Sequence, residues 1–310
     1  MTGSRTTERS AVGLGAMMLA VTVWAAYALS IRSVASSSLT PGDLALLRFA
    51  VPVALLLPWL PRTLRRCREL PLPALTGVAV GAGLPFLLLS EAGGAASTAS
   101  LVGLVIPGTV PLFVSVLAFV LLRERPGRVR LLALAPIVAG VVVTLVLGPN
   151  GVPAAGIVLL LAAGALWSGY TLALGRAGLK PVEVVLVIAV PSLLATIVAM
   201  AAGLLDTRML RGDSTVPDIL AIAGVQGVAV GVLSTLCYSF AVRRIGSRTA
   251  SALGALSPVL TAVLAVPFFH EVPDAVMIAG LALILTGVLA ATAASGPRRR
   301  AAATAPAGRA

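Results

Sequence analysis

Two tryptophan–tyrosine pairs with the same spacing lie inside long apolar runs. Trp24 and Tyr27 form the first pair, and Trp167 and Tyr170 form the second. Residues three apart share one face of a helix, so each pair presents two rings in one direction. Such rings are suited to lining a cavity for a small solute. The alternative is the aromatic belt at a membrane surface, which fits the tyrosines better than the deeper tryptophans.

Arg48 is the only charged residue well inside an apolar run. A central Arg costs about 2.5–3.5 kcal/mol on membrane-insertion scales, so it needs a partner or a wet cavity. Glu91 is the best candidate partner in the sequence. A structural ion pair and a cavity site for a substrate carboxylate are both open interpretations.

Three prolines, Pro107, Pro111 and Pro258, lie near the middle of two apolar runs. Each removes the helical hydrogen bond to the carbonyl four residues earlier, which frees the carbonyls of Gly103, Pro107 and Gly254. Unpaired backbone at membrane depth is tolerated where it faces protein or a wet cavity. These carbonyls are therefore candidate acceptors for a substrate amine, and the alternative is a simple kink that shapes packing.

Polar residues recur on one further run, at Gln226, Ser234 and Tyr238. The last two are four apart and share a helix face. We assign all three to the same cavity, with hydrogen bonding between packed helices as the alternative. The segment "GVAVG" occurs at 77–81 and again at 227–231, and its glycines favour close helix packing.

Glu124 and Glu271 each end an apolar run, and a proline follows two residues later. A carboxylate is poorly placed at the negative C-terminal end of its own helix. Proline favours the first turn of a helix, so each Glu precedes a new N-terminus whose free N–H groups favour an anion. We predict that each Glu stabilises a tight hairpin, with Arg128 or Arg130 as further partners of Glu124. Proton coupling or gating is the alternative.

The sequence lacks enzyme signatures. It has one histidine, which excludes a His-cluster zinc site, and it has no Gly-rich phosphate loop, G-x-S-x-G or H-E-x-x-H. The two cysteines, Cys67 and Cys237, do not resemble a disulfide framework or a metal site. We expect no catalytic residue, no metal and no cofactor.

The composition is that of a polytopic membrane protein. Hydrophobic residues make up 58% of the 310-residue chain and charged residues 11%, against roughly 25% charged in a soluble domain. Runs of about 20 apolar residues match the thickness of a bilayer core. The sequence predicts an all-α membrane protein with ten spans. The spans are expected at 11–31, 41–60, 71–91, 97–122, 129–147, 154–174, 182–203, 217–241, 248–269 and 274–294.

The basic residues are distributed unevenly between alternate loops. With the N-terminus in the cytoplasm, nineteen Lys and Arg fall on the cytoplasmic side and three on the other. This positive-inside pattern predicts that both termini are cytoplasmic. The net charge of +12 then reflects insertion and anionic lipid rather than nucleic acid. Residues 1–10 form the cytoplasmic N-terminus in this interpretation, and residues 295–310 a disordered basic tail.

The chain also repeats itself. At an offset of 147, residues 111–140 match 258–287 at eleven of thirty positions. Together with the aromatic pairs and "GVAVG", this predicts two five-helix repeats, 11–147 and 154–294. Five is odd, so the second repeat enters the membrane from the opposite side, a recurrent plan of secondary transporters.

The order of these features resembles the EamA-type drug/metabolite transporter family. The features are "VWAAYALS", "LALLRF", a hydroxyl-rich start to the fourth and ninth spans, and a mid-span Pro with a terminal Glu on both. The resemblance covers roughly residues 11–294. It implies a ten-helix exporter of small metabolites, with a cavity lined mainly by helices 1, 3, 4, 6, 8 and 9.

We therefore expect a secondary transporter of the cytoplasmic membrane. It would export an amino acid, a nucleobase or a similar solute by alternating access. Its partners would be the solute and the lipid bilayer, with a homodimer left open. A passive channel is the main alternative, and a membrane-embedded enzyme is less favoured.

Overall fold

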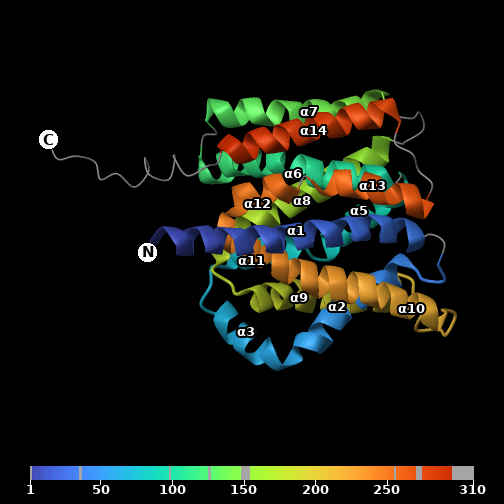
Figure 1. The fold of residues 1–310 in the computed structure, drawn as a ribbon. Coiled ribbons are helices and arrows are strands. Elements are labelled where there is room, and N and C mark those ends of the chain that lie inside the picture. Colours follow the sequence, from blue (N-terminus) through green and yellow to red (C-terminus); the bar gives the residue numbers. More distant parts are fainter. Residues whose placement is uncertain are drawn as a thin grey trace.

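The computed structural model describes residues 2–34, 37–97, 99–124, 127–147, 154–254, 256–269 and 274–294. Within these ranges every regular element is a helix (Figure 1). The first half contains α1 (Thr2–Val34), α2 (Pro41–Leu56), η1 (Leu57–Trp59), α3 (Leu60–Cys67), α4 (Leu72–Gly81), α5 (Leu84–Ala95), α6 (Ala99–Leu122) and α7 (Arg128–Leu147). The second half contains α8 (Ala154–Ala177), α9 (Pro181–Ala201), α10 (Val216–Ile222), η2 (Ala223–Ser234), α11 (Thr235–Ile245), α12 (Ser247–Gly254), α13 (Ser257–Phe269) and α14 (Ala275–Ala294).

The helices have the length and composition of membrane spans. Within the described residues, seven segments are long and apolar enough to cross a bilayer, and two shorter apolar helices cover Leu131–Val143 and Ala275–Gly287. The chain is therefore a multi-pass membrane protein. Figure 1 shows that α1 begins and α14 ends at the same end of the bundle.

The predicted run 71–91 is divided into two helices, α4 and α5. A side chain at Gly83 would meet the Ala79 carbonyl oxygen at 2.1 Å, so only glycine fits this bend. Ser192 on α9 accepts a hydrogen bond from the Leu84 N–H, at 3.1 Å, which satisfies one free donor at the start of α5. The break redirects α5 toward the middle of the molecule.

The predicted run 248–269 is likewise divided, into α12 and α13. Pro258 is the second residue of α13, where its missing N–H costs little. The alternative interpretation of this proline, a kink within one continuous helix, does not apply, because α12 ends at Gly254 and α13 begins at Ser257. The Gly254 carbonyl as an acceptor for a substrate stays a prediction.

The predicted run 217–241 forms α10, η2 and α11 without a gap. The η2 segment is wound as a π-helix. Its buried side includes Gln226, Val230 and Ser234, which are spaced four apart. This wider turn presents Gln226 to the interior, opposite α2.

α7 and α14 pack side by side along their length (Figure 1). A side chain at Gly140 would meet the Gly280 carbonyl oxygen at 2.5 Å, and one at Gly287 would meet the Ala133 carbonyl oxygen at 2.9 Å. Residues 140 and 287 are equivalent at the offset of 147, and so are 133 and 280. The two contacts are thus reciprocal, as a two-fold relation between the halves requires.

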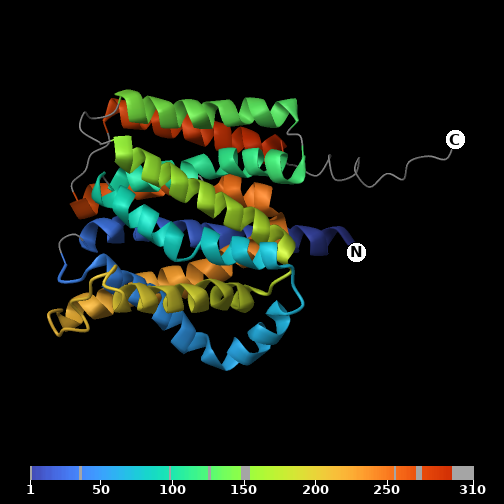
Figure 2. The same cartoon turned by 180° about the vertical axis from the view of Figure 1, so that it is seen from behind.

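α8 runs obliquely across the bundle against α4, α5 and α6 (Figure 2). Gly77 and Gly81 allow α4 to approach it, since a side chain at Gly81 would meet the Leu166 carbonyl oxygen at 2.6 Å. Gly227 and Gly231 serve the same purpose elsewhere, where η2 packs on Val51 and Pro52 of α2. Both "GVAVG" segments therefore mediate close packing, although against non-equivalent helices.

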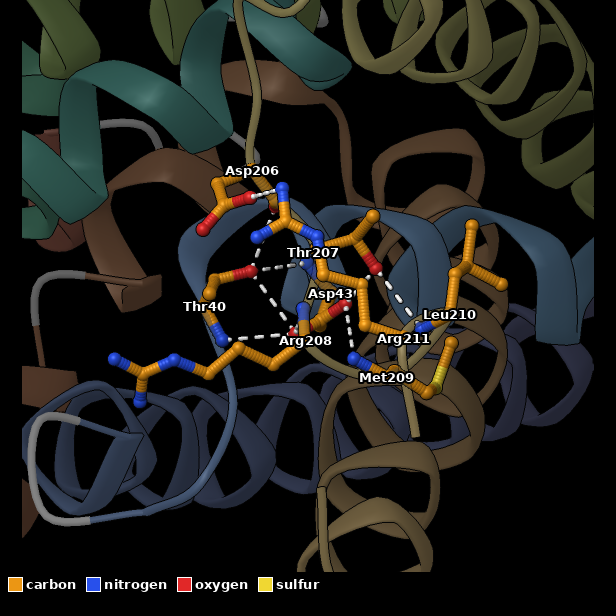
Figure 3. A network of polar contacts seen from close by, with 8 residues as sticks. All are labelled: Thr40, Asp43, Asp206, Thr207, Arg208, Met209, Leu210 and Arg211. Atoms are coloured by element: carbon orange, nitrogen blue, oxygen red, sulfur yellow. Dashed lines mark hydrogen bonds and ion pairs between the residues drawn. The ribbon is translucent and has the colours of Figure 1, made fainter. Parts of the chain in front are cut away.

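A carboxylate network joins the start of α2 to the segment between α9 and α10 (Figure 3). The Asp43 side chain is fully buried and accepts hydrogen bonds from Thr40 N at 3.0 Å and Thr207 Oγ1 at 2.5 Å. It also accepts from the backbone N–H groups of Arg208 and Met209, at 3.1 and 3.3 Å. Asp43 therefore caps its own helix and holds a segment more than 160 residues away.

Candidate functional site

A cavity lies at the centre of the bundle, between the two halves of the chain. Helices α1, α2, α5 and α6 of the first half contribute to its walls, as do α8, η2, α11, α12 and α13 of the second. Its volume is about 50 Å³. Its walls are formed by Trp24, Tyr27, Ala28, Arg48, Phe86, Val102, Gly103, Ile106, Pro107, Val110, Trp167, Val230, Tyr238, Ser251, Gly254 and Ser257.

Aromatic rings from four helices, α1, α5, α8 and α11, meet at this cavity. Trp24 and Trp167 lie edge to face, with centroids 5.4 Å apart. Tyr238 contacts both, at centroid distances of 5.0 and 5.8 Å, and Phe86 lies 4.9 Å from Trp167. The Tyr238 hydroxyl shares a hydrogen bond of 2.7 Å with Thr171 Oγ1. The rings form a rigid apolar wall whose parts come from both halves.

Arg48 is the only charged side chain among the described residues that line the cavity. Its side chain is 5% exposed, and its guanidinium carbon lies 5.1 Å above the centroid of the Tyr27 ring. Nη1 donates to Gln226 Oε1 at 2.7 Å, and Gln226 Nε2 donates to Ser30 Oγ at 2.9 Å. The group is held in place by neutral partners on α1 and η2.

Glu91 differs from its expected role as the ion-pair partner of Arg48. The two side chains are close enough for their charges to interact, but among the described residues they form no ion pair within 4.0 Å. Glu91 is 8% exposed, and its Oε1 has no hydrogen-bond partner. Gln226, 178 positions along the chain, occupies the place expected for Glu91.

The structure brings eight of the thirteen predicted cavity residues to the cavity wall. Pro111, Tyr170, Gln226, Ser234 and Pro258 are not in that wall. Tyr170 is fully buried behind Trp167 and Tyr238, and Gln226 contacts Arg48 instead. Ser234 borders a second, smaller cavity together with Arg48 and Trp167.

Several wall residues were not predicted. Ser251 lies three residues before Gly254 on α12, a spacing that places both on one helix face, so this signal was present in the sequence. Ser257 begins α13, and no helical spacing relates it to Gly254. Phe86 reaches the cavity because α5 changes direction at Gly83. The sequence "GLP" at 83–85 marks that break, since Pro85 suits the first turn of a helix.

Glu124 lies away from the cavity, at the end of α6. Its carboxylate forms ion pairs with Arg176, at 2.8 Å, and with Arg248. These arginines belong to α8 and α12 of the second half. Arg128, an expected partner, forms no ion pair with Glu124 among the described residues, and the side chain of Arg130 lies outside them. The carboxylate therefore links the two halves of the chain. Glu271 and residues 295–310 lie outside the described residues.

The comparisons with known proteins identify the family. The model of the EamA-like transporter family matches residues 11–146 and again residues 154–293. The chain belongs to the EamA-like transporter family. The earlier resemblance is confirmed, and the protein is a membrane transporter of this family built from two matching repeats.

A solved structure agrees with this fold. A chain titled "Crystal structure of protein" superposes with a TM-score of 0.65 at 22% sequence identity, covering 95% of this EamA-like chain and 99% of its own length. At that identity the likeness concerns the fold alone. A search of curated proteins finds no match.

Proposed function

We propose that this protein is a secondary transporter that exports a small metabolite across the cytoplasmic membrane by alternating access. An amino acid, a nucleobase or a solute of similar size is the expected cargo. The observation that carries the proposal is the central cavity, whose wall joins Trp24 and Trp167 from equivalent places in the two repeats.

The size of the cavity supports a moving carrier rather than an open pore. Sites for small molecules commonly enclose about 300–1,000 Å³. The cavity of about 50 Å³ is far smaller, so a metabolite enters only when the walls separate. Because both repeats form the wall, a rocking of one repeat against the other opens it, which is the movement that inverted repeats allow.

The arrangement in the membrane follows from the same repeats. Ten spans, in two sets of five, give the second repeat the opposite orientation and return the C-terminus to the side of the N-terminus. The common end of α1 and α14 supports this count (Figure 1). The positive-inside pattern assigns that end to the cytoplasm.

An export screen tests the proposal. Cells that overproduce the chain are loaded with a panel of labelled amino acids, nucleobases and organic acids, and efflux is measured against cells with the empty vector. We expect faster efflux of at least one solute, with a rate that saturates as its internal concentration rises. Non-saturable flux would indicate a channel, and a chemically altered product would indicate an enzyme.

A further inference from the structure

The cavity of this transporter has an unbalanced charge. Arg48 provides a fixed positive charge, and no carboxylate is found among the described residues of the wall. The remaining side-chain polar groups of the wall are hydroxyls and indole nitrogens. The wall is otherwise aromatic and aliphatic, so its chemistry combines one cation with flat apolar surfaces.

The guanidinium is held in a way that leaves donors for a ligand. Nη1 of Arg48 donates a hydrogen bond to Gln226, and the Tyr27 ring covers one face of the guanidinium. No further hydrogen bond joins Arg48 to the residues that the structure describes. Arg presents five N–H donors in a planar fork that matches a carboxylate. One hydrogen bond to an amide therefore leaves most of this recognition surface unused.

A buried cation without an ion-pair partner is unfavourable, and a bound anion would relieve it. Glu91 does not fulfil this role, because it is not in the wall and forms no ion pair with Arg48 within 4.0 Å among the described residues. We infer, on the basis of the proposed transport function, that Arg48 forms the anion-binding end of the cavity. The cargo is then a small organic anion, a carboxylate with a flat or apolar body, rather than a cation.

The aromatic wall specifies the rest of the ligand. Trp24, Trp167 and Tyr238 present ring edges and faces within 6 Å of one another, which favours a planar or apolar body. A compact polar anion such as inorganic phosphate would lose its hydration against this surface without replacement. The inference thus predicts two preferences of the cavity: for anions over cations, and for carboxylates with a flat or apolar body over compact anions such as phosphate.

Binding to the purified full chain in lipid nanodiscs tests the inference. Trp59 is exposed and is not part of the cavity wall, so Trp59→Phe leaves Trp24 and Trp167 as the fluorescent reporters. The probes are benzoate, benzyl alcohol and benzylamine, which share one ring and carry charges of −1, 0 and +1, together with zwitterionic phenylalanine. We expect benzoate to bind at least about tenfold more tightly than benzylamine, because its carboxylate can form a charge-assisted hydrogen bond with Arg48.

Two variants and a control assign the effect to Arg48. Arg48→Gln should remove the preference for benzoate while binding of benzyl alcohol persists, which also reports a folded cavity. Arg62 is exposed on α3, so Arg62→Gln should change neither the preference for benzoate nor the binding of benzyl alcohol. Glu91→Gln should leave benzoate binding equal or tighter, since it removes a like charge near the site.

The inference is overturned if benzylamine or phenylalanine binds more tightly than benzoate, or if Glu91→Gln weakens benzoate. It is also overturned if no probe gives a saturable signal, or if inorganic phosphate displaces the ligand as well as benzoate does. A different result would contradict the proposed transport function without contradicting the anion site. If benzoate binds through Arg48 but proteoliposomes show no flux of any bound anion, the anion site stands and transport does not.

Discussion

The indole rings of Trp24 and Trp167 meet edge to face across the boundary between the two repeats, with centroids 5.4 Å apart and planes at 89°. Each tryptophan begins a W-x-x-Y pair, and each lies in the first helix of its repeat. Equivalent residues that touch must lie close to the axis that relates the repeats. The contact therefore couples the cavity wall to any movement of one repeat against the other.

Replacing either tryptophan with Ala should reduce export after correction for protein abundance. An edge-to-face pair contributes about 0.5–1.5 kcal/mol beyond area burial, and Ala also leaves a cavity. Trp24→Phe and Trp167→Phe, which keep a ring, should be milder than the Ala variants. Trp59→Ala, at an exposed position, is the control. Normal efflux by both Ala variants at normal abundance would contradict an aromatic wall.

Gly140→Ala and Gly287→Ala should each destabilise the protein by a similar amount. A β-carbon at either position would lie less than 3.0 Å from a carbonyl oxygen of the facing helix, so α7 and α14 must separate. Strain of this kind typically costs about 1–3 kcal/mol. Gly169→Ala on α8 has open space around it and should stabilise its helix by up to about 1 kcal/mol. Thermal unfolding in detergent measures all three, and equal melting temperatures would exclude the reciprocal contact.

The long apolar runs were predictable because a bilayer imposes a length on each span. Each of the ten predicted runs falls on one or more helices of the described residues, although the runs 71–91 and 248–269 are divided. The pair Pro41-x-Asp43 and its counterpart Pro181-x-Glu183 both begin helices, since Asp43 caps through Thr40 and Glu183 accepts from Lys180 N at 2.7 Å. These signals are local, so the sequence contains them.

The partners of charged residues were not predictable in the same way. Arg48 binds Gln226, and Glu124 binds Arg176 and Arg248, across separations of 178, 52 and 124 residues. The sequence indicates that a buried Arg requires a partner, but the choice between Glu91 and Gln226 depends on the change of direction before α5 and on the π-helical winding of η2. Tertiary geometry of this kind leaves no periodic signal.

Asp43→Asn should loosen the segment between α9 and α10. The carboxylate accepts from donors on both oxygens, and an amide nitrogen would face some of these donors and leave them unpaired. Each buried unsatisfied donor costs about 1–3 kcal/mol. We expect a lower melting temperature and faster proteolysis within residues 202–215. Asp213→Asn, on the same segment but exposed, should behave like the parent. Equal proteolysis of the two variants would show that Asp43 does not hold the segment.

Cys67 should be labelled from the cytoplasmic side only. It is the last residue of α3, half-buried, and follows Arg65 and Arg66 of this basic helix. In a Cys237→Ser background, a membrane-impermeant maleimide should label it only after cells are permeabilised. Asp213→Cys, in a Cys67→Ser and Cys237→Ser chain, should react in intact cells. The reverse pattern would invert the proposed orientation.

Glu124 links α6 to two helices of the second repeat, and its variants separate a structural role from proton coupling. The pairs with Arg176 and Arg248 are 40–53% exposed, and exposed ion pairs contribute about 0–1 kcal/mol. Glu124→Gln should therefore lower the melting temperature slightly and keep the pH profile of transport. Glu124→Arg should be worse, because it places a third cation beside the two arginines.

A charge swap provides the matched test for this link. Glu124→Arg combined with Arg248→Glu restores opposite charges between α6 and α12, so the double variant should recover part of the stability that Glu124→Arg loses. High salt should reduce the difference between the single and double variants, because exposed charges are screened within about 10 Å at 0.1 M. Thermal unfolding at two salt concentrations and efflux at several pH values measure these effects. A Gln variant that folds normally but transports without any pH dependence would favour coupling over a structural link.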